Sequence, residues 1–152
     1  MEINGWRIYF LKRVFGAQRQ ELRDKVRILK TKLPRDEYIR HPTVKLYAGV
    51  MRAIKEIIPQ DPYASKLTLS GPLKSYGRVK KMGIPNRYRL FFRAFATPEQ
   101  KSIFILWLGY PRKEGAKNDC YQVFARMVKR GEFPKKLDEL VEVSGEGSET
   151  YL

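Results

Sequence analysis

Histidine and cysteine are nearly absent from this chain of 152 residues, which contains one of each, His41 and Cys120. A single cysteine excludes an internal disulfide, and one cysteine with one histidine cannot form an ordinary protein zinc site. We therefore expect no metal site and no cofactor, so any chemistry must depend on lysine, arginine, tyrosine and carboxylate groups. His41 precedes Pro42 at an expected helix start and suits a capping or surface role. Cys120 is expected to be a small buried residue.

Long hydrophobic runs are also missing. The longest, from Ile103 to Leu108, is far too short to span a bilayer, and the first residues show no charged leader followed by an apolar stretch. We therefore expect a cytoplasmic protein without membrane contact. The length suits one domain, which we place over residues 1–143, followed by a disordered acidic tail over 144–152.

Acidic residues are absent between Asp61 and Glu99. The whole chain has 31 Lys and Arg against 16 Asp and Glu, a net charge of +15, and a sequence pI near 10.0. Such a balance is typical of proteins that bind nucleic acid. A basic membrane-surface protein would have a similar composition, but here the charge is expected on strands and loops rather than on a basic amphipathic helix.

The segment from Asn86 to Arg93 inside this window has the residue types of a β-strand. Alternation with period 2 places the side chains on two opposite faces. One face would carry Arg87, Arg89, Phe91 and Arg93, and the other Tyr88, Leu90 and Phe92. Most single lysines and arginines of a basic protein are simply solvated, but Arg89 stands out because alternation and the lack of nearby acids agree there. Arg87 and Arg93 share its face and would steer a nucleic acid.

Hydrophobic periodicity and breakers predict the remaining elements. The expected elements are strands over 6–10, 77–82, 87–96 and 102–108, helices over 15–32 and 42–58, a helix starting at Asn118-Asp119, and a short helix over 137–143. This order predicts an α+β domain with an antiparallel sheet, in which an N-terminal helical hairpin packs on one face and a C-terminal helix follows. The other sheet face is expected to keep the arginines exposed.

Three pieces of the chain resemble the YhaV family of bacterial toxins, which belongs to the RelE-like superfamily. They are Asn4-Gly5-Trp6, the strand Arg87–Arg93, and the stretch from Asp119 to Pro134, within a similarity that runs from about Asn4 to Pro134. The resemblance implies a RelE-like fold and the toxin of a type II toxin-antitoxin system. It also implies an endoribonuclease that cleaves RNA, including mRNA on or off the ribosome, and a hetero-oligomer with a PrlF-like antitoxin that keeps it silent.

The resemblance further implies which positions carry the function. The implied catalytic residues are Arg78, Lys80, Arg89, Arg112 and Tyr121. The expected RNA-binding residues are Lys81, Arg87, Arg93, Lys113 and Lys117. Lys113 is also an alternative to Arg112 as the loop residue after the central strand.

RNA can be cut without a metal ion when its 2′-hydroxyl attacks the adjacent phosphorus. This reaction needs a base, stabilisation of an anionic phosphorane, and an acid for the leaving 5′-oxygen. Arginine remains protonated, so Arg78, Arg89 and Arg112 are expected to bind phosphoryl oxygens. Lysine is more easily tuned by neighbouring cations, which makes Lys80 the expected proton-transfer group, with Lys81 or Tyr121 as alternatives. Tyr121 could also stack on a base or belong to the core.

Two other functions remain open at this point. The chain could be a non-catalytic RNA- or DNA-binding module with a basic sheet face, or a degenerate toxin homologue that only pairs with its antitoxin. The intact set of five implied catalytic residues argues against degeneration. In every case, affinity for nucleic acid should fall steeply with salt, because bound Lys and Arg displace counterions.

Overall fold

The computed structural model describes residues 1–110 and 119–147. Its strands are β1 (Glu2–Ile3), β2 (Trp6–Leu11), β3 (Gly77–Val79), β4 (Arg89–Ala96), β5 (Lys101–Gly109) and β6 (Ser144–Glu146). Its α-helices are α1 (Ala17–Lys32), α2 (Arg35–Arg40), α3 (Pro42–Arg52), α4 (Asp119–Lys129) and α5 (Leu137–Glu142). A π-helical turn, Lys12–Gly16, leads into α1, and a second, Ala53–Ile57, extends α3. None of the helices in these ranges is long and apolar enough to cross a membrane.

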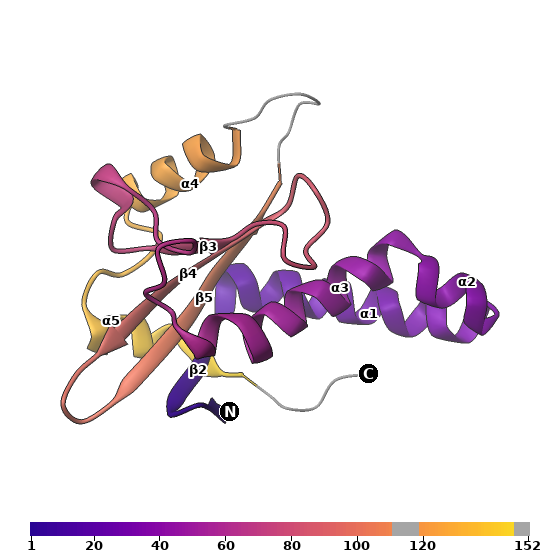
Figure 1. The fold of residues 1–152 in the computed structure, drawn as a ribbon, viewed down its shortest axis with the longest axis horizontal. Helices are drawn as coiled ribbons and strands as arrows, with labels where there is room; N and C mark the ends of the chain where they lie inside the picture. The colour runs from indigo at the N-terminus through magenta and orange to yellow at the C-terminus, as the bar shows by residue number, and fades with distance from the viewer. Residues whose placement is uncertain (111–118, 148–152) are drawn as a thin grey trace.

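The strands form one mixed sheet, and this corrects the expected antiparallel arrangement. The order is β1-β2-β5-β4-β3, and β6 lies beside β2 as well (Figure 1). Strand β5 is central, as its nearly continuous apolar run predicts, and pairs antiparallel with β4. It pairs parallel with β2, so that Ile8 lies opposite Ile103. The α+β class is confirmed, but the pairing of the first strand could not be deduced from local patterns.

The expected helical hairpin is present and packs on one face of the sheet. Helices α1 and α3 lie side by side and project beyond the sheet, with the unexpected short helix α2 at their far end (Figure 1). His41 caps α3, because its Nδ1 accepts a hydrogen bond of 3.1 Å from the backbone N–H of Thr43. The capping role expected for His41 is confirmed, and Pro42 occupies the first turn.

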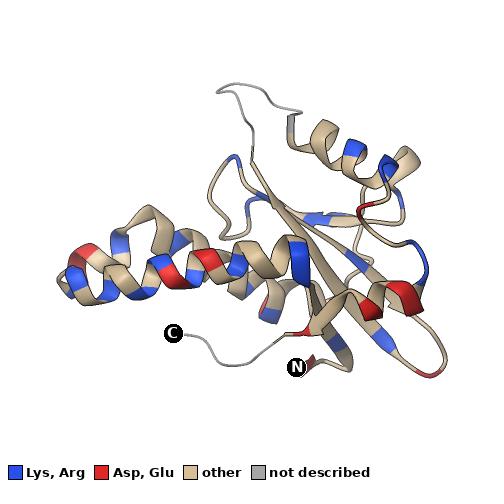
Figure 2. Ribbon diagram, turned by 180° about the vertical axis from the view of Figure 1, so that it is seen from behind, with Lys and Arg blue, Asp and Glu red and all other residues tan. Residues whose placement is uncertain are grey.

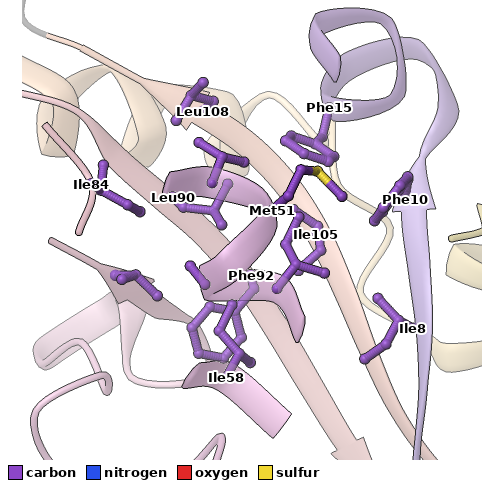
Figure 3. Packing of buried hydrophobic residues seen from close by; sticks show 14 of the residues in the cluster. Ile8, Phe10, Phe15, Met51, Ile58, Ile84, Leu90, Phe92, Ile105 and Leu108 are labelled. Atoms are coloured by element: carbon purple, nitrogen blue, oxygen red, sulfur yellow. The ribbon is translucent and has the colours of Figure 1, made fainter. Parts of the chain in front are cut away.

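The sheet has a hydrophobic core on each face, so the expectation of one exposed cationic face is wrong. On one face Leu90 and Phe92 of β4 pack with side chains of the hairpin such as Phe15 and Met51 (Figure 3). On the other face Phe91 packs with residues of α4 and α5. Alternation along β4 therefore holds, but the second face is covered. Helix α4 supplies that cover because four of its residues are buried: Cys120, Val123, Phe124 and Met127.

Positive charge also extends well beyond the sheet. Residues 12–58, which form the hairpin, contain 13 Lys and Arg against 5 Asp and Glu, a net charge of +8. Figure 2 shows basic positions along α1 and α3 as well as on the strands. The expectation that the charge clusters on strands and loops is therefore wrong, because the hairpin carries much of it.

The end of the chain is more ordered than expected. Ser144–Glu146 form β6 and pair with β2, in which Leu11 lies opposite Ser144. Glu146 also forms an ion pair with Arg7, with 3.5 Å between Oε1 and Nε. A disordered tail from Ser144 is thus wrong for these three residues, whereas residues 148–152 lie outside the described ranges.

Gln18 of α1 completes the hydrogen bonding of β5 at the point where β2 ends. Its Nε2 donates to the carbonyl of Leu108 and its Oε1 accepts from the N–H of Leu108, both at 2.8 Å. Leu108 is only 4% exposed, so water cannot easily replace the lost partner. We expect Gln18→Ala to lower the free energy of unfolding by about 1–3 kcal/mol in chemical denaturation.

Gln20 on the same helix supplies a matched control. Its amide bonds the exposed carboxylate of Asp24 at 3.0 Å. Gln20→Ala should change stability by no more than about 0.5 kcal/mol. Equal losses from the two substitutions would contradict a specific role for the Gln18 bridge.

Candidate functional site

Two arginines from adjacent strands meet at one tyrosine. Arg78 of β3 donates from Nε to the hydroxyl oxygen of Tyr121 at 3.0 Å, and Arg89 of β4 donates from Nε to the same oxygen at 3.2 Å. All three side chains are half-buried. We call these three residues the Arg–Tyr cluster. The structure thus brings together three of the five expected catalytic residues.

Backbone carbonyls hold both guanidinium groups of the cluster in place. Nη1 of Arg78 donates to the carbonyl of Lys66 at 3.0 Å, and Nη1 of Arg89 donates to the carbonyl of Tyr88 at 2.8 Å. A guanidinium group has five N–H donors, so each arginine retains donors for a further ligand. Anchored cations need little reorganisation when an anion binds, which is the arrangement that stabilises developing negative charge.

Tyr121 is positioned by the start of α4 and by the sheet beneath it. The preceding residue, Cys120, is 3% exposed, as expected, and its thiol lies 3.9 Å from the carbonyl oxygen of Arg87 as a hydrogen-bond donor. The ring of Tyr121 packs edge-on against Phe91, with centroids 5.8 Å apart and an angle of 80°. The packing interpretation of Tyr121 is therefore confirmed. Its hydroxyl binds the two arginines instead, because ring and hydroxyl have different partners, and its catalytic role stays a prediction.

The far end of α4 explains why the helix stops where it does. Gly131 has a φ of +78°, and its N–H bonds the carbonyl of Val128 at 3.0 Å. The N–H of Glu132 reaches back to the carbonyl of Met127 at 3.1 Å. These two bonds form a Schellman motif, which the sequence Lys129-Arg130-Gly131 predicts.

Lys80 and Lys81 lie in a loop, residues 80–88, which we call the basic loop. Strand β3 ends at Val79, opposite Leu90, and Lys80 is the first residue after this last pair. Both lysines are exposed, and Lys81 has a left-handed φ of 58°. Residues other than glycine that are held in a left-handed backbone conformation are strained, and such residues are concentrated at functional sites.

The basic loop is held against α3 through a glycine. A Cβ added to Gly49 would lie 2.3 Å from the carbonyl oxygen of Gly83, so only glycine permits this approach. Ile84 of the loop is 3% exposed and joins the core of the hairpin face. The lysines therefore extend from a loop with a fixed base.

Arg87 does not lie on the strand, contrary to the alternation argument. It belongs to the basic loop with a φ of 82°, and the N–H of Tyr88 bonds the carbonyl of Pro85 at 3.2 Å, so the chain turns before β4 begins at Arg89. The side chain of Arg87 is exposed. Its position beside the cluster is compatible with RNA steering.

Arg93 lies away from the Arg–Tyr cluster, four residues along β4. Its guanidinium carbon lies 4.5 Å from the ring centroid of Phe95 and 5.3 Å from that of Tyr76, in a cation–π arrangement. Partial burial raises the pKa of nearby Tyr63, and the positive charge of Arg93 opposes this effect. These rings hold the side chain of Arg93, and its expected role in RNA binding stays a prediction.

Three expected site residues lie outside the described ranges. They are Arg112, Lys113 and Lys117, all in the segment 111–118.

The described residues around the cluster are strongly biased in charge. No acidic residue occurs from Pro62 to Pro98, and the ion pairs found within residues 1–110 and 119–147 do not include Arg78 or Arg89. Within those ranges, no group of three His, Cys, Asp or Glu side chains could hold a metal ion.

Sequence reasoning missed two features of this region. Lys66 contributes through its backbone carbonyl, which no sequence pattern could reveal. Tyr110 follows the glycine at the end of β5 and is 56% exposed, next to Tyr88. The sequence could have indicated Tyr110, because it is an aromatic residue directly after the expected central strand.

The fold and the cluster define an α+β protein with a basic site suited to an anionic ligand. Comparison with known families then identifies its relatives. Residues 9–145 match the YhaV toxin family, described as toxin with endonuclease activity, of toxin-antitoxin system. The chain belongs to this family, and it is a toxin of a toxin-antitoxin system with endonuclease activity.

Individual relatives agree with the family. Toxin YhaV from Escherichia coli O6:H1 is 35% identical over 152 residues, which cover 95% of each chain. Ribonuclease toxin YhaV from Escherichia coli strain K12 and Toxin YhaV from Escherichia coli O157:H7 are each 36% identical over 146 residues, or 91% of each chain. No solved structure matches this chain.

Proposed function

We propose that this toxin is a metal-independent endoribonuclease of the RelE-like type, which cleaves RNA by attack of the 2′-hydroxyl on the neighbouring phosphate. The observation that carries the proposal is the convergence of Arg78 and Arg89 on the hydroxyl oxygen of Tyr121. Such a site offers fixed cations to a phosphate group in a stretch of chain without carboxylates. The name of one relative, ribonuclease toxin YhaV, supports RNA as the substrate.

The arginines stabilise the charge that develops on phosphorus. The phosphorane formed by 2′-oxygen attack carries more negative charge on its non-bridging oxygens than the ground state does. The remaining N–H donors of Arg78 and Arg89 bind these oxygens, while their carbonyl partners keep both groups oriented. Arg112, which lies in the segment 111–118, is proposed to assist in binding the phosphate.

Proton transfer is assigned to Lys80, with Lys81 or Tyr121 as alternatives. The 2′-hydroxyl gives its proton to a base, its oxygen forms a bond to phosphorus, and the bond to the 5′-oxygen breaks as that oxygen receives a proton from an acid. The products are a 2′,3′-cyclic phosphate and a 5′-hydroxyl. Lys80 is supported by its place two residues after Arg78 and directly after β3, and Tyr121 by its hydroxyl within the cluster. Lys81 and Arg87 bind the flanking RNA, and Lys113 and Lys117 are proposed to do so as well.

The proposed partner is a PrlF-like antitoxin, which forms a hetero-oligomer with the toxin in the cytoplasm and silences it. Membership in a toxin-antitoxin family supports an antitoxin partner. An antitoxin could silence the site by presenting carboxylates to the Arg–Tyr cluster, because opposite charges would occupy the donors that RNA needs.

A cleavage assay in EDTA tests the proposed function. We expect the purified toxin to cut a single-stranded RNA in EDTA and to leave 2′,3′-cyclic phosphate ends. An RNA with a single 2′-deoxy group at the cut site should remain intact there, because it lacks the nucleophile. Cleavage that depends on added Mg²⁺, or that cuts the 2′-deoxy position, would contradict the mechanism. Gel shifts without cleavage would favour a non-catalytic binding module.

A further inference from the structure

An exposed aromatic pair lies at the edge of the site. Tyr110 directly follows β5 and is 56% exposed, and its ring lies against that of Tyr88, with centroids 5.7 Å apart and an angle of 44°. Tyr88 is half-buried and packs against the core on the hairpin face. Tyr110 therefore rests on a supported ring while most of its own surface faces solvent.

The pair is physically joined to the Arg–Tyr cluster. Arg89, the residue after Tyr88, bonds the Tyr88 carbonyl through Nη1 at 2.8 Å, and it bonds Tyr121 through Nε. Arg89 also lies opposite Gly109, the residue before Tyr110, in the β4–β5 ladder. Tyr88 thus binds the Arg89 guanidinium through its own carbonyl, and Tyr110 directly follows the residue that lies opposite Arg89 in the ladder.

The two sites lie on opposite sides of the same strand end. Alternation directs Arg89 towards α4, whereas Tyr88 faces the hairpin. A strand of RNA whose phosphate binds Arg78 and Arg89 can pass around this end of the sheet and bring an adjacent base over Tyr110. The exposed cations of the basic loop, Lys80, Lys81 and Arg87, follow the same edge.

We propose that Tyr110, supported by Tyr88, is a stacking site for an RNA base next to the scissile phosphate. This inference rests on the proposed ribonuclease function and adds a binding residue to it. Single-stranded RNA is commonly held by a cationic groove together with aromatic rings on which bases stack. Tyr121 is less suited to this task, because its ring already contacts Phe91 and its hydroxyl binds two guanidinium groups.

Binding of a non-cleavable RNA, with 2′-deoxy at the cut site, tests the proposal. Stacking on one aromatic ring contributes about 1–3 kcal/mol, so Tyr110→Ala should weaken binding by about fivefold to 150-fold. Tyr110→Trp should keep or strengthen binding, since indole also stacks. Ile39→Ala is the matched control, because Ile39 is a similarly exposed apolar residue, 51%, at the far end of the hairpin.

An abasic scan identifies the stacked base and separates stacking from general weakening. Removing one base should weaken binding to the wild-type toxin at a single position, and the same removal should have little effect on Tyr110→Ala. If every abasic RNA loses equal affinity with both proteins, Tyr110 does not stack on a base. Loss of folding in Tyr110→Ala, detected by circular dichroism, would shift the test to Tyr110→Trp and Tyr110→Ser in the same scan.

The outcomes also separate this inference from the proposed function. If wild-type toxin cleaves RNA and Tyr110→Ala binds and cleaves equally well, the stacking site is wrong and the ribonuclease stands. If wild-type toxin neither binds nor cleaves RNA, the ribonuclease proposal itself is wrong.

Discussion

Arg89→Ala should lower the rate of RNA cleavage by about a hundredfold to a thousandfold, the usual cost of removing one preorganised group that stabilises a transition-state anion. Arg89 donates to Tyr121 and to the Tyr88 carbonyl, so the substitution removes both the proposed phosphate ligand and a partner of the tyrosine. Single-turnover cleavage at saturating toxin measures the chemical step. Because Arg89 is half-buried at the end of β4, the fold should persist, which circular dichroism checks.

Two further variants show whether this loss reflects chemistry or charge alone. Arg93→Ala removes the same charge from the same strand, but Arg93 packs over aromatic rings away from the cluster, so its single-turnover rate should be nearly unchanged. Arg89→Lys keeps the charge but loses the planar guanidinium group that binds two partners at once. Its single-turnover cleavage rate should therefore remain far below that of the wild type. Normal cleavage by a folded Arg89→Ala protein would contradict the proposed role of Arg89.

Local patterns in the sequence predicted the arginine strand well. Leu90 and Phe92 face one core and Phe91 the other, as alternation requires, because side-chain direction in a strand depends only on the parity of position. The start of the strand was wrong by two residues. The left-handed φ of Arg87 has no marker in its residue type, and the turn closed by Pro85 and Tyr88 depends on how the loop meets α3.

Contacts between distant parts of the chain could not be predicted in this way. The parallel pairing of β2 with β5 joins Ile8 to Ile103, and no short-range pattern determines which strands become neighbours. The apolar residues of α4 predicted an amphipathic helix but not which face of the sheet it covers. The grouping of Arg78, Arg89 and Tyr121 came from family resemblance, because these residues come from separate segments of the chain.

Phe91 lies in the hydrophobic core between the sheet and α4, and it also contacts the Arg–Tyr cluster through Tyr121. Its replacement should have a large effect on stability. Its ring is fully buried, stacked on Phe124 at 4.2 Å and on Trp107 at 5.4 Å between centroids, and it meets the edge of Tyr121. We expect Phe91→Ala to lower the free energy of unfolding by about 3–5 kcal/mol, through lost burial and the cavity that remains. Chemical denaturation measures the change. Domains are stable by only about 5–15 kcal/mol in total, so this loss is a large fraction.

Two milder substitutions show whether Phe91 stabilises only the fold or also positions the Arg–Tyr cluster. Phe95→Ala removes a half-buried ring from the same strand and should cost much less than Phe91→Ala. Phe91→Leu retains an apolar side chain but removes the flat partner of Tyr121, so most of the stability should remain while cleavage falls. If Phe91→Leu instead cleaves RNA at the wild-type rate, Tyr121 is positioned by its hydrogen bonds to Arg78 and Arg89 alone. In that case the aromatic stack beneath it contributes to folding and not to catalysis.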